Sequence, residues 1–321
     1  MKDVLKRIGA AGIVPVVKID NPKDAVPVAQ ALLDGGLPVV EITFRTVHAK
    51  ESINRITREL PDVLTGAGTV LNTEQVDAAV EAGAKFIVSP GFNQDVVKYC
   101  IDRDITIIPG CVTPSDIERA MAFGIDTVKF FPAEAYGGVK TIKALSAPYP
   151  NIKFIPTGGI DPSNLNTYLS FDKVLACGGS WMVKDEIIRS GDFERIKVLT
   201  KQAVNLMLGF DISHVGMNMQ SAEEARDAAG LFEQAFGLEI QEHDNCLFAS
   251  SYVEIMKIPF RGRYGHIAIG TNSVERAVSY LRYKGTEFDE ETAEYDEKGK
   301  LQSIYLKKHA GGFAIHLLQK K

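Results

Sequence analysis

Eight short apolar runs, separated by helical patterns, make up the first 208 residues of the chain. The runs begin 20 to 26 residues apart. Because they are almost continuously apolar, they are typical of strands that are buried on both faces of a parallel sheet. The predicted strands cover residues 13–19, 39–44, 64–70, 86–90, 106–112, 127–133, 153–160 and 173–182.

The segments between these runs predict helices. Three of them start at residue types that favour helix N-caps, namely Asn72, Thr113 and Asp161. Eight alternations of strand and helix predict an α/β fold of the (β/α)8 TIM-barrel class. The alternative is a doubly wound open sheet, which rarely needs eight such even units. A helix over 193–208 closes the repeat, so we expect a barrel domain over residues 1–208.

The pattern changes at Gly209 and Asp211, and the last third of the chain reads as two copies of another unit. Apolar strands are predicted at 212–219 and 263–271, and each is followed by an amphipathic helix and then by further strands. Each copy spans about 50 residues, a length at which one unit rarely buries its own core. We therefore expect residues 211–321 to form an α+β domain of duplicated βαβββ units.

Composition limits the class of protein. Hydrophobic residues make up 45% and charged residues 24%, as in ordinary soluble globular proteins. The net charge of −5 provides no footprint for nucleic acid, and no apolar run approaches the ~20 residues of a membrane span. The four cysteines lack a CxxC pair, and the first twelve residues lack a signal-peptide pattern. We expect a cytoplasmic protein whose partners are small molecules, with no nucleic acid and no membrane.

A lysine within the sixth predicted strand is the first candidate for chemistry. Active sites of barrels lie at the carboxyl ends of the strands. Lys129 stands in the run TVKFFPA, where burial disfavours its charged form and favours a nucleophilic amine. Such an amine forms a Schiff base with a carbonyl substrate. The alternative is a plain charge partner at the mouth of the strand.

The second predicted strand carries polar residues on one face. In EITFRT, the period of two places Glu41, Thr43 and Arg45 on the same side. An interior carboxylate suits a general acid or base, and the planar fork of Arg45 suits a substrate carboxylate. The alternative is that Glu41 and Arg45 only neutralise each other.

Two glycine pairs follow the seventh and eighth predicted strands. The loops TGGI (157–160) and GGSW (178–181) allow backbone N–H groups to approach an anion, and Ser180 adds a hydroxyl donor. In barrels these two loops often bind phosphate. Together with Lys129 and Glu41, they predict a class I aldolase that acts on a phosphorylated 2-oxo acid.

Residues 1–208 also resemble a known family through long, ordered motifs: VVEITFRT, GAGTVLN, VSPGFN, IPGCVTPS, VKFFPAEAYGGV, PTGGI and CGGSW. The family is that of 2-dehydro-3-deoxy-6-phosphogluconate (KDPG) aldolase and 4-hydroxy-2-oxoglutarate (KHG) aldolase. The resemblance implies a homotrimer that needs no metal or other cofactor. It implies that Lys129 forms the Schiff base, that Glu41 is the general acid/base, that Arg45 and Thr69 hold the pyruvyl carboxylate, that Pro90 and Phe131 line the pocket, and that Gly158, Gly159, Gly179 and Ser180 bind phosphate.

Residues 211–321 resemble the vicinal oxygen chelate superfamily, which includes glyoxalase I and methylmalonyl-CoA epimerase. The motifs are SHVGMNM, YVEIMK, YGHIAIG and FAIHLLQ. The resemblance implies four metal ligands, two from each repeat, for a divalent zinc, nickel, cobalt or iron ion. The usual fourth ligand is Glu, so His316 is a departure. The implied ligands are His214, Glu254, His266 and His316.

Three further histidines receive no role: His243 and His309 are expected at the surface, and His48 is expected to be unremarkable. The predicted function is a lyase that cleaves KDPG, and also 4-hydroxy-2-oxoglutarate, joined to a metal-dependent isomerase or epimerase of a carbonyl metabolite. Two alternatives remain open. The second domain could instead be a ligand sensor without catalysis, or the barrel could be a 2-oxo acid decarboxylase.

Overall fold

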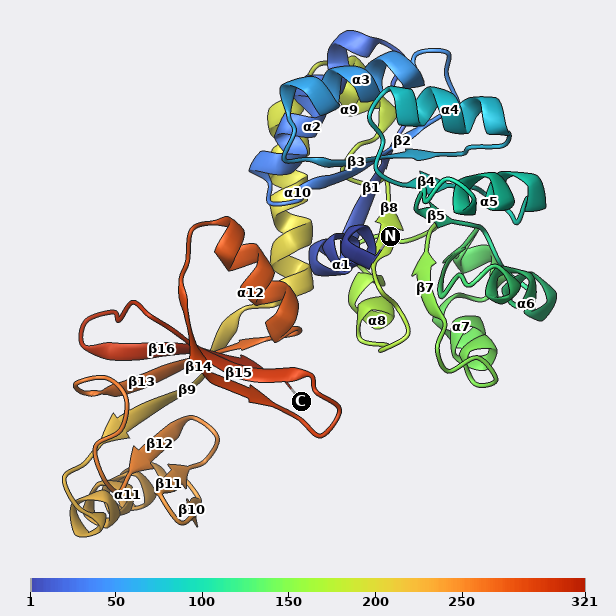
Figure 1. Cartoon of the computed structure of the whole chain (residues 1–321). Helices are drawn as coiled ribbons and strands as arrows, with labels where there is room; N and C mark the ends of the chain where they lie inside the picture. Colours follow the sequence, from blue (N-terminus) through green and yellow to red (C-terminus); the bar gives the residue numbers. More distant parts are fainter. Residues whose placement is uncertain (1, 321) are drawn as a thin grey trace. The chain divides into compact units, whose positions relative to one another are not determined.

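The computed structural model describes residues 2–320, and the chain divides into two compact units, Met1–Met207 and Leu208–Lys321 (Figure 1). No helix within 2–320 is long and apolar enough to cross a membrane.

The first unit is a closed parallel barrel. Six strands pair in the order β5-β4-β3-β2-β1-β8, and β6 pairs with β7. Single bridges, Gly110 to Lys129 and Thr157 to Gly178, join the pair to the two outer strands and close the ring. The TIM-barrel prediction is therefore confirmed. The strands are β1 (Ile13–Val17), β2 (Val39–Thr43), β3 (Leu64–Gly68), β4 (Ile87–Val88), β5 (Ile107–Ile108), β6 (Thr127–Phe130), β7 (Lys153–Pro156) and β8 (Cys177–Gly179).

Helices follow the strands around the barrel (Figure 1). Two predicted N-caps form: the Asn72 side chain accepts from the Gln75 backbone N–H, and Thr113 forms a capping box with Asp116. The prediction for Asp161 is wrong, because the helix begins at Leu165 with Asn164 at the N-cap position, and the Asp161 carboxylate accepts from Ser163 in the turn before it. The helices are α2 (Ala25–Asp34), α3 (Ala49–Glu59), α4 (Thr73–Glu81), α5 (Gln94–Ile101), α6 (Pro114–Ala122), α7 (Gly138–Ser146), α8 (Leu165–Leu169), α9 (Asp185–Arg189) and α10 (Phe193–Leu208), with short 3-10 turns η1 (Pro22–Asp24) and η2 (Glu134–Tyr136).

A helix that the strand pattern did not predict, α1 (Lys2–Ala11), closes the amino end of the barrel. Its Ile8 is fully buried and belongs to one apolar cluster with Val14, Val39 and Leu64, which lie at or next to the first residues of their strands. This plug packs apolar side chains into the amino end of the barrel. The buried polar pair, Lys129 and Glu41, comes from residues further along β6 and β2.

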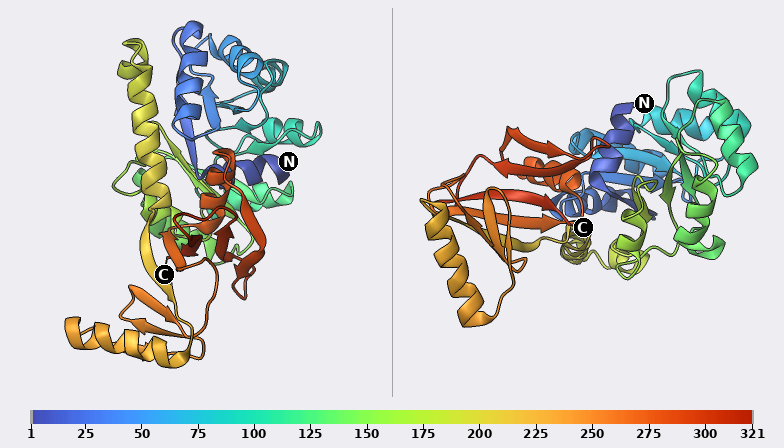
Figure 2. Two further views of the ribbon diagram at one scale, coloured as in Figure 1. Left: turned by 90° about the vertical axis from the view of Figure 1, so that its left-hand side faces the viewer. Right: turned by 90° about the horizontal axis from the view of Figure 1, so that it is seen from below.

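The second unit is mostly sheet. Eight strands pair in the order β10-β11-β12-β9-β13-β16-β15-β14, and α11 lies along one side of the strands (Figure 2). Ala225 and Ala229 of α11 pack on Leu247 and Ile255 of the sheet. The elements are β9 (Asp211–Asn218), α11 (Ala222–Phe236), β10 (Ile240–Glu242), β11 (Cys246–Ala249), β12 (Val253–Met256), β13 (Gly265–Thr271), α12 (Val274–Tyr283), β14 (Phe288–Tyr295), β15 (Leu301–Leu306) and β16 (Phe313–Gln319).

The plug generates a stability prediction. Replacing Ile8 by Ala should lower the free energy of unfolding of the barrel by about 2 to 5 kcal/mol, because a fully buried side chain leaves a cavity. Trp181 is the chain's one tryptophan and follows β8, so its fluorescence in a denaturant titration reports the barrel. Lys6→Ala, at an exposed position of α1, is the control. Equal free energies of unfolding for the two variants would contradict the prediction that Ile8 of α1 stabilises the barrel.

Candidate functional site

A buried ion pair crosses the interior of the barrel. Lys129 of β6 and Glu41 of β2 approach with 3.3 Å between Nζ and Oε1, and their side chains are only 7% and 4% exposed. Four strand positions separate β2 from β6 in either direction around the ring, so the two side chains can meet only through the interior. The structure thus brings together the two residues predicted to be catalytic.

The position of Glu41 depends on a glycine in the neighbouring strand. A Cβ atom at Gly68 of β3 would lie 1.9 Å from Oε1 of Glu41. Only a residue without a side chain leaves room for the carboxylate there. Gly68 is part of the motif GAGT, but the sequence pattern assigned it no role.

Arg45 and Thr69 meet at the carboxyl end of adjacent strands. Arg45 follows β2 and is exposed, and its Nε donates to Oγ1 of Thr69 at 3.3 Å. Strand β2 ends at Thr43, so Arg45 lies in the turn beyond the strand. The acidic partner of Lys129 is Glu41, and no ion pair joins Glu41 to Arg45 among the pairs within residues 2–320.

The aromatic ring of Phe131 connects the ion pair with the first glycine loop. Nζ of Lys129 lies 5.5 Å from the centroid of this ring. A Cβ at Gly158 would lie 3.3 Å from Cδ2 of the same ring, so the loop after β7 packs against Phe131. Pro90, two residues beyond β4, is half-buried, and its carbonyl oxygen packs against Gly110.

The two glycine loops lie side by side. The bridge between Thr157 and Gly178 joins β7 to β8 just before Gly158, Gly159, Gly179 and Ser180. Gly158 and Gly159 adopt φ angles of 98° and 78°, in the left-handed region that favours glycine. Gly179 is buried against the Trp181 ring, whereas Ser180 is exposed. The arrangement can present backbone N–H groups to an anion at the carboxyl end of the barrel.

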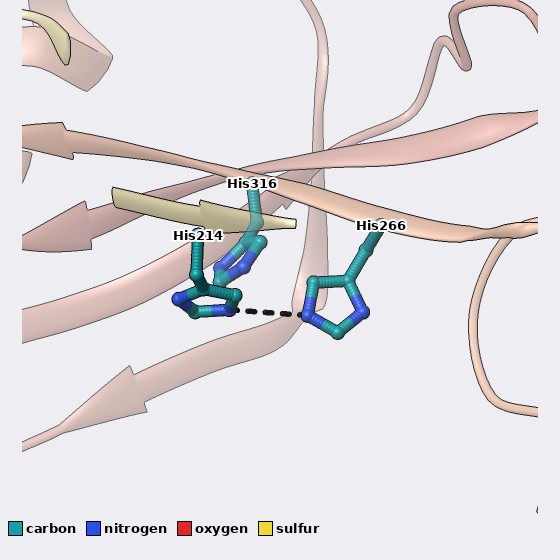
Figure 3. Close-up of side chains that lie close together, drawn as sticks. All are labelled: His214, His266 and His316. Atoms are coloured by element: carbon teal, nitrogen blue, oxygen red, sulfur yellow. Dashed lines mark hydrogen bonds between the residues drawn. The ribbon is translucent and has the colours of Figure 1, made fainter. Parts of the chain in front are cut away.

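Four side chains converge in the second unit, three histidines and one glutamate. Nε2 of His214 lies 3.2 Å from Nε2 of His266 (Figure 3). Oε2 of Glu254 lies 2.9 Å from Nε2 of His266 and 3.2 Å from Nε2 of His214. One nitrogen from each of His214, His266 and His316 lies within 4.8 Å of the others. This is the set that the sequence predicted as metal ligands.

Strand register explains the convergence. His214 and His266 lie on the central strands β9 and β13, and the other two residues lie on the flanking strands β12 and β16. Glu254 is paired with Gly216, which lies two residues after His214 in β9. His316 is paired with Ala268, which lies two residues after His266 in β13. Paired residues and residues two apart share a face, so all four project from one face of the sheet. The pairs are His214 with Ala268, Gly216 with both His266 and Glu254, and Ala268 with His316.

Glycine again makes room for the site. A Cβ at Gly216 would lie 2.1 Å from Cε1 of His266, so the imidazole lies directly over Gly216. Ile255, next to Glu254 in β12, packs against α11 on the other face. Helix α11 therefore does not cover the histidine face.

His316 is held by two residues to which the sequence pattern gave no role. Its Nδ1 lies 3.2 Å from Oγ of Ser303, and its ring stacks on Tyr305 with 4.5 Å between centroids and 16° between planes. Burial, together with positive charge on His266 and His214, lowers the pKa of His316 to about 3, so its imidazole is neutral at pH 7. Neutral imidazole is the form that binds metals.

The donor chemistry fits a divalent ion. Burial raises the pKa of Glu254, but hydrogen bonds from His214 and His266 outweigh burial and hold this pKa below its usual value. Among the residues described, Nδ1 of His266 and Nε2 of His316 are buried polar atoms without a hydrogen-bond partner. An ion bound by His316 would satisfy the latter. Imidazole and carboxylate suit zinc, nickel, cobalt or iron.

The remaining histidines lie outside both sites. His243 and His309 are exposed, and His48 is half-buried at the start of α3, where its side chain makes no capping hydrogen bond.

Comparison with known proteins identifies the barrel. The family profile for KDPG and KHG aldolase matches residues 4–199. The 2-dehydro-3-deoxy-phosphogluconate aldolase of Treponema pallidum is 47% identical over 207 residues, which cover 64% of this chain and 99% of that protein. The KHG/KDPG aldolase of Escherichia coli K12 is 43% identical over 192 residues, which cover 60% of this chain and 90% of that protein.

A solved structure agrees. The KDPG aldolase of Legionella pneumophila, with pyruvate captured at low pH as a covalent carbinolamine intermediate, is 37% identical and superimposes with a TM-score of 0.60. The match covers 62% of this chain and 97% of that one. The family profile ends before the second unit, which it leaves unassigned. Through its barrel, the chain belongs to the KDPG and KHG aldolase family, and it is a lyase.

Proposed function

We propose that the barrel, residues 1–208, is a Schiff-base aldolase that cleaves KDPG to pyruvate and glyceraldehyde 3-phosphate. It would also cleave 4-hydroxy-2-oxoglutarate to pyruvate and glyoxylate. The observation that carries the proposal is the buried approach of Lys129 to Glu41, at 3.3 Å. An amine and a carboxylate at this distance are a nucleophile and a base within reach of one substrate carbon. The names of the relatives support the same substrates.

The reaction follows from these two groups. Glu41 accepts a proton from Lys129, and the neutral amine attacks C2 of the 2-oxo acid to form a carbinolamine. Loss of water gives an iminium ion. A base then takes the proton of the C4 hydroxyl, the C3–C4 bond breaks into the iminium, and the aldehyde leaves. Protonation of the enamine at C3 and hydrolysis release pyruvate and restore Lys129.

The surrounding residues orient the substrate in this proposal. Arg45 and Thr69, joined at 3.3 Å, bind the carboxylate next to the reacting carbon. Phe131 and Pro90 form apolar walls of the pocket. Gly158, Gly159, Gly179 and Ser180 bind the phosphate at the end of the substrate. The family resemblance also leads us to propose a homotrimer.

Two other interpretations use the same residues. A 2-oxo acid decarboxylase would use the same iminium ion, but it has no use for the paired glycine loops, which favour a phosphorylated substrate. A structural ion pair would need no access to substrate. Lys129 lies in the carboxyl half of β6 and meets Glu41 from the middle of β2, with Arg45 and Thr69 just beyond the carboxyl ends of β2 and β3, and this placement favours catalysis.

For the second unit, we propose a duplicated βαβββ domain whose metal site uses His214, Glu254, His266 and His316. The same order of elements follows β9 and β13, and the four side chains converge from equivalent register positions. When bound, a zinc, nickel, cobalt or iron ion would act as a Lewis acid toward adjacent oxygens of a carbonyl metabolite. The domain would then isomerise or epimerise that metabolite. The alternative is a sensor that binds a ligand without turnover.

Replacing Lys129 by Ala should abolish aldol cleavage and the covalent adduct that borohydride traps with pyruvate, because no other group supplies the amine. A lactate-dehydrogenase-coupled assay measures pyruvate release, and mass spectrometry measures the adduct. Lys50→Ala, at a surface ion pair, is the control and should keep both. Full activity of Lys129→Ala would eliminate the Schiff-base assignment.

Replacing Gly68 by Ala should lower kcat at least about 100-fold while the fold is retained, because the new Cβ displaces the Glu41 carboxylate. Gly91→Ala is the matched control, since a Cβ at Gly91 meets nothing within 4 Å. Steady-state kinetics with KDPG and a circular dichroism spectrum measure the two properties. Equal kcat for the two variants would show that the carboxylate does not depend on Gly68.

The double variant His214→Ala/His266→Ala should lose Co²⁺ binding, because it removes two of the four proposed ligands. Equilibrium dialysis followed by elemental analysis measures bound metal. The variant His243→Ala/His309→Ala removes two exposed histidines and should bind Co²⁺ like the unaltered chain. Chelator should leave aldol cleavage unchanged. Equal binding by both double variants would contradict the metal site.

A further inference from the structure

We infer that the metal-loaded site of the second unit binds small 2-oxo carboxylate anions, and that His316 determines this preference. The inference rests on the metal site proposed above. It names the ligand class of that site, which is the class of molecule that the proposed barrel reaction releases.

The charge of the donor set favours an anionic ligand. Glu254 contributes one negative charge, and the three imidazoles bind metal in their neutral form. A divalent ion in this set therefore keeps a net charge of +1. A glutamate at position 316 would bring the net charge to zero. The three-histidine set thus attracts an anion, and a set with two carboxylates would not.

The contacts of His316 show how its imidazole is held as a neutral ligand. Nδ1 lies 3.2 Å from Oγ of Ser303, a hydroxyl that can accept the ring proton and so leave the lone pair on Nε2. Nε2 is buried and has no partner among the residues described. Tyr305 stacks on the ring and fixes its plane. A carboxylate at this position would meet neither the hydroxyl nor the aromatic face in the same way.

Neighbouring charged side chains do not cancel the net positive charge of the ion and its four ligands. The Arg261 guanidinium lies 5.1 Å from the centroid of the Tyr305 ring, but it pairs with Asp289 at 2.9 Å. Glu294 acts on Tyr305 from an exposed position of β14, where solvent screens it. The local charge is therefore set by the ion and its ligands.

Two aromatic rings pack against histidines of the site. Phe248 meets His214 edge-on at 5.7 Å between centroids, and Phe260 meets His266 at 6.4 Å. Apolar surroundings lower the local dielectric constant and strengthen the attraction between the ion and an anion. A 2-oxo acid offers a carboxylate oxygen and a carbonyl oxygen that chelate one ion. These properties favour a bidentate monoanion over a neutral carbonyl compound.

The test uses the full chain carrying Lys129→Ala, so that pyruvate cannot form a Schiff base in the barrel. The protein is loaded with Co²⁺, whose visible absorption reports its own ligands. Pyruvate should change the spectrum and bind at least about tenfold more tightly than pyruvamide, which has the same shape without the charge. Acetate, which lacks the adjacent carbonyl, should also bind more weakly than pyruvate.

A matched variant isolates the role of His316. His316→Glu in the same background keeps four ligands but removes the net charge, so Co²⁺ should still bind and the affinity for pyruvate should fall at least about tenfold. Unchanged pyruvate affinity in this variant would overturn the role of His316. The comparison of pyruvate with pyruvamide in the chain that keeps His316 tests the ligand class even where the variant does not fold.

The outcomes separate the two proposals. Absence of Co²⁺ binding would overturn the metal site and this inference together. Binding of Co²⁺ with equal responses to pyruvate and pyruvamide would overturn the inference alone and leave the metal site standing. A spectral change with pyruvate that is absent with pyruvamide and weaker in His316→Glu supports it.

Discussion

The function proposed for the barrel depends on one interaction, the buried approach of Lys129 to Glu41. Removing two charges from water costs several kcal/mol per ion, and mutual attraction offsets this only at close range. Here the side chains are 7% and 4% exposed and their atoms are 3.3 Å apart. Such a pair is weak evidence for stability. In the proposed function it supplies a nucleophile and a proton acceptor at one point of a largely buried site.

The rest of the first unit makes this pair possible. Helix α1 closes the amino end, where Ile8 joins the apolar cluster, and Lys129 and Glu41 meet further along their strands. Gly68 leaves space that the carboxylate occupies. Arg45, Thr69 and the glycine loops lie at the ends of the strands around the pair, where small changes in the loops alter binding without disturbing the core.

In the second unit, equivalent strand pairings in the two halves of the sheet bring four side chains together. Two central strands each supply a histidine, and two flanking strands supply Glu254 and His316 from equivalent positions. Gly216 leaves space for His266, as Gly68 does for Glu41. In both units a glycine on a neighbouring strand leaves the space that a side chain of the proposed site occupies.

The sequence by itself determined much of the fold. Periods of two and 3.6 residues are local properties, so eight strands, most helices and the closing helix 193–208 could be predicted from the pattern. The role of α1 could not be read from the pattern, because it consists in the packing of Ile8 against several strands. The N-cap at Asp161 was wrong because the chain makes a further turn there and the helix begins only at Leu165. The sequence also showed which positions carry acidic, basic or imidazole side chains, among them Glu41, Lys129, His214 and His316.

Tertiary structure alone decided which of these residues meet. Lys129 and Glu41 are 88 residues apart, and only closure of the ring brings them to 3.3 Å. Gly68 and Gly216 act by the space that they leave for a side chain on another strand, which has no signature in the local pattern. Ser303 and Tyr305 became partners of His316 only through pairing of β15 with β16. Local periodicity specifies elements, whereas a site requires distances between distant segments, and packing sets those distances.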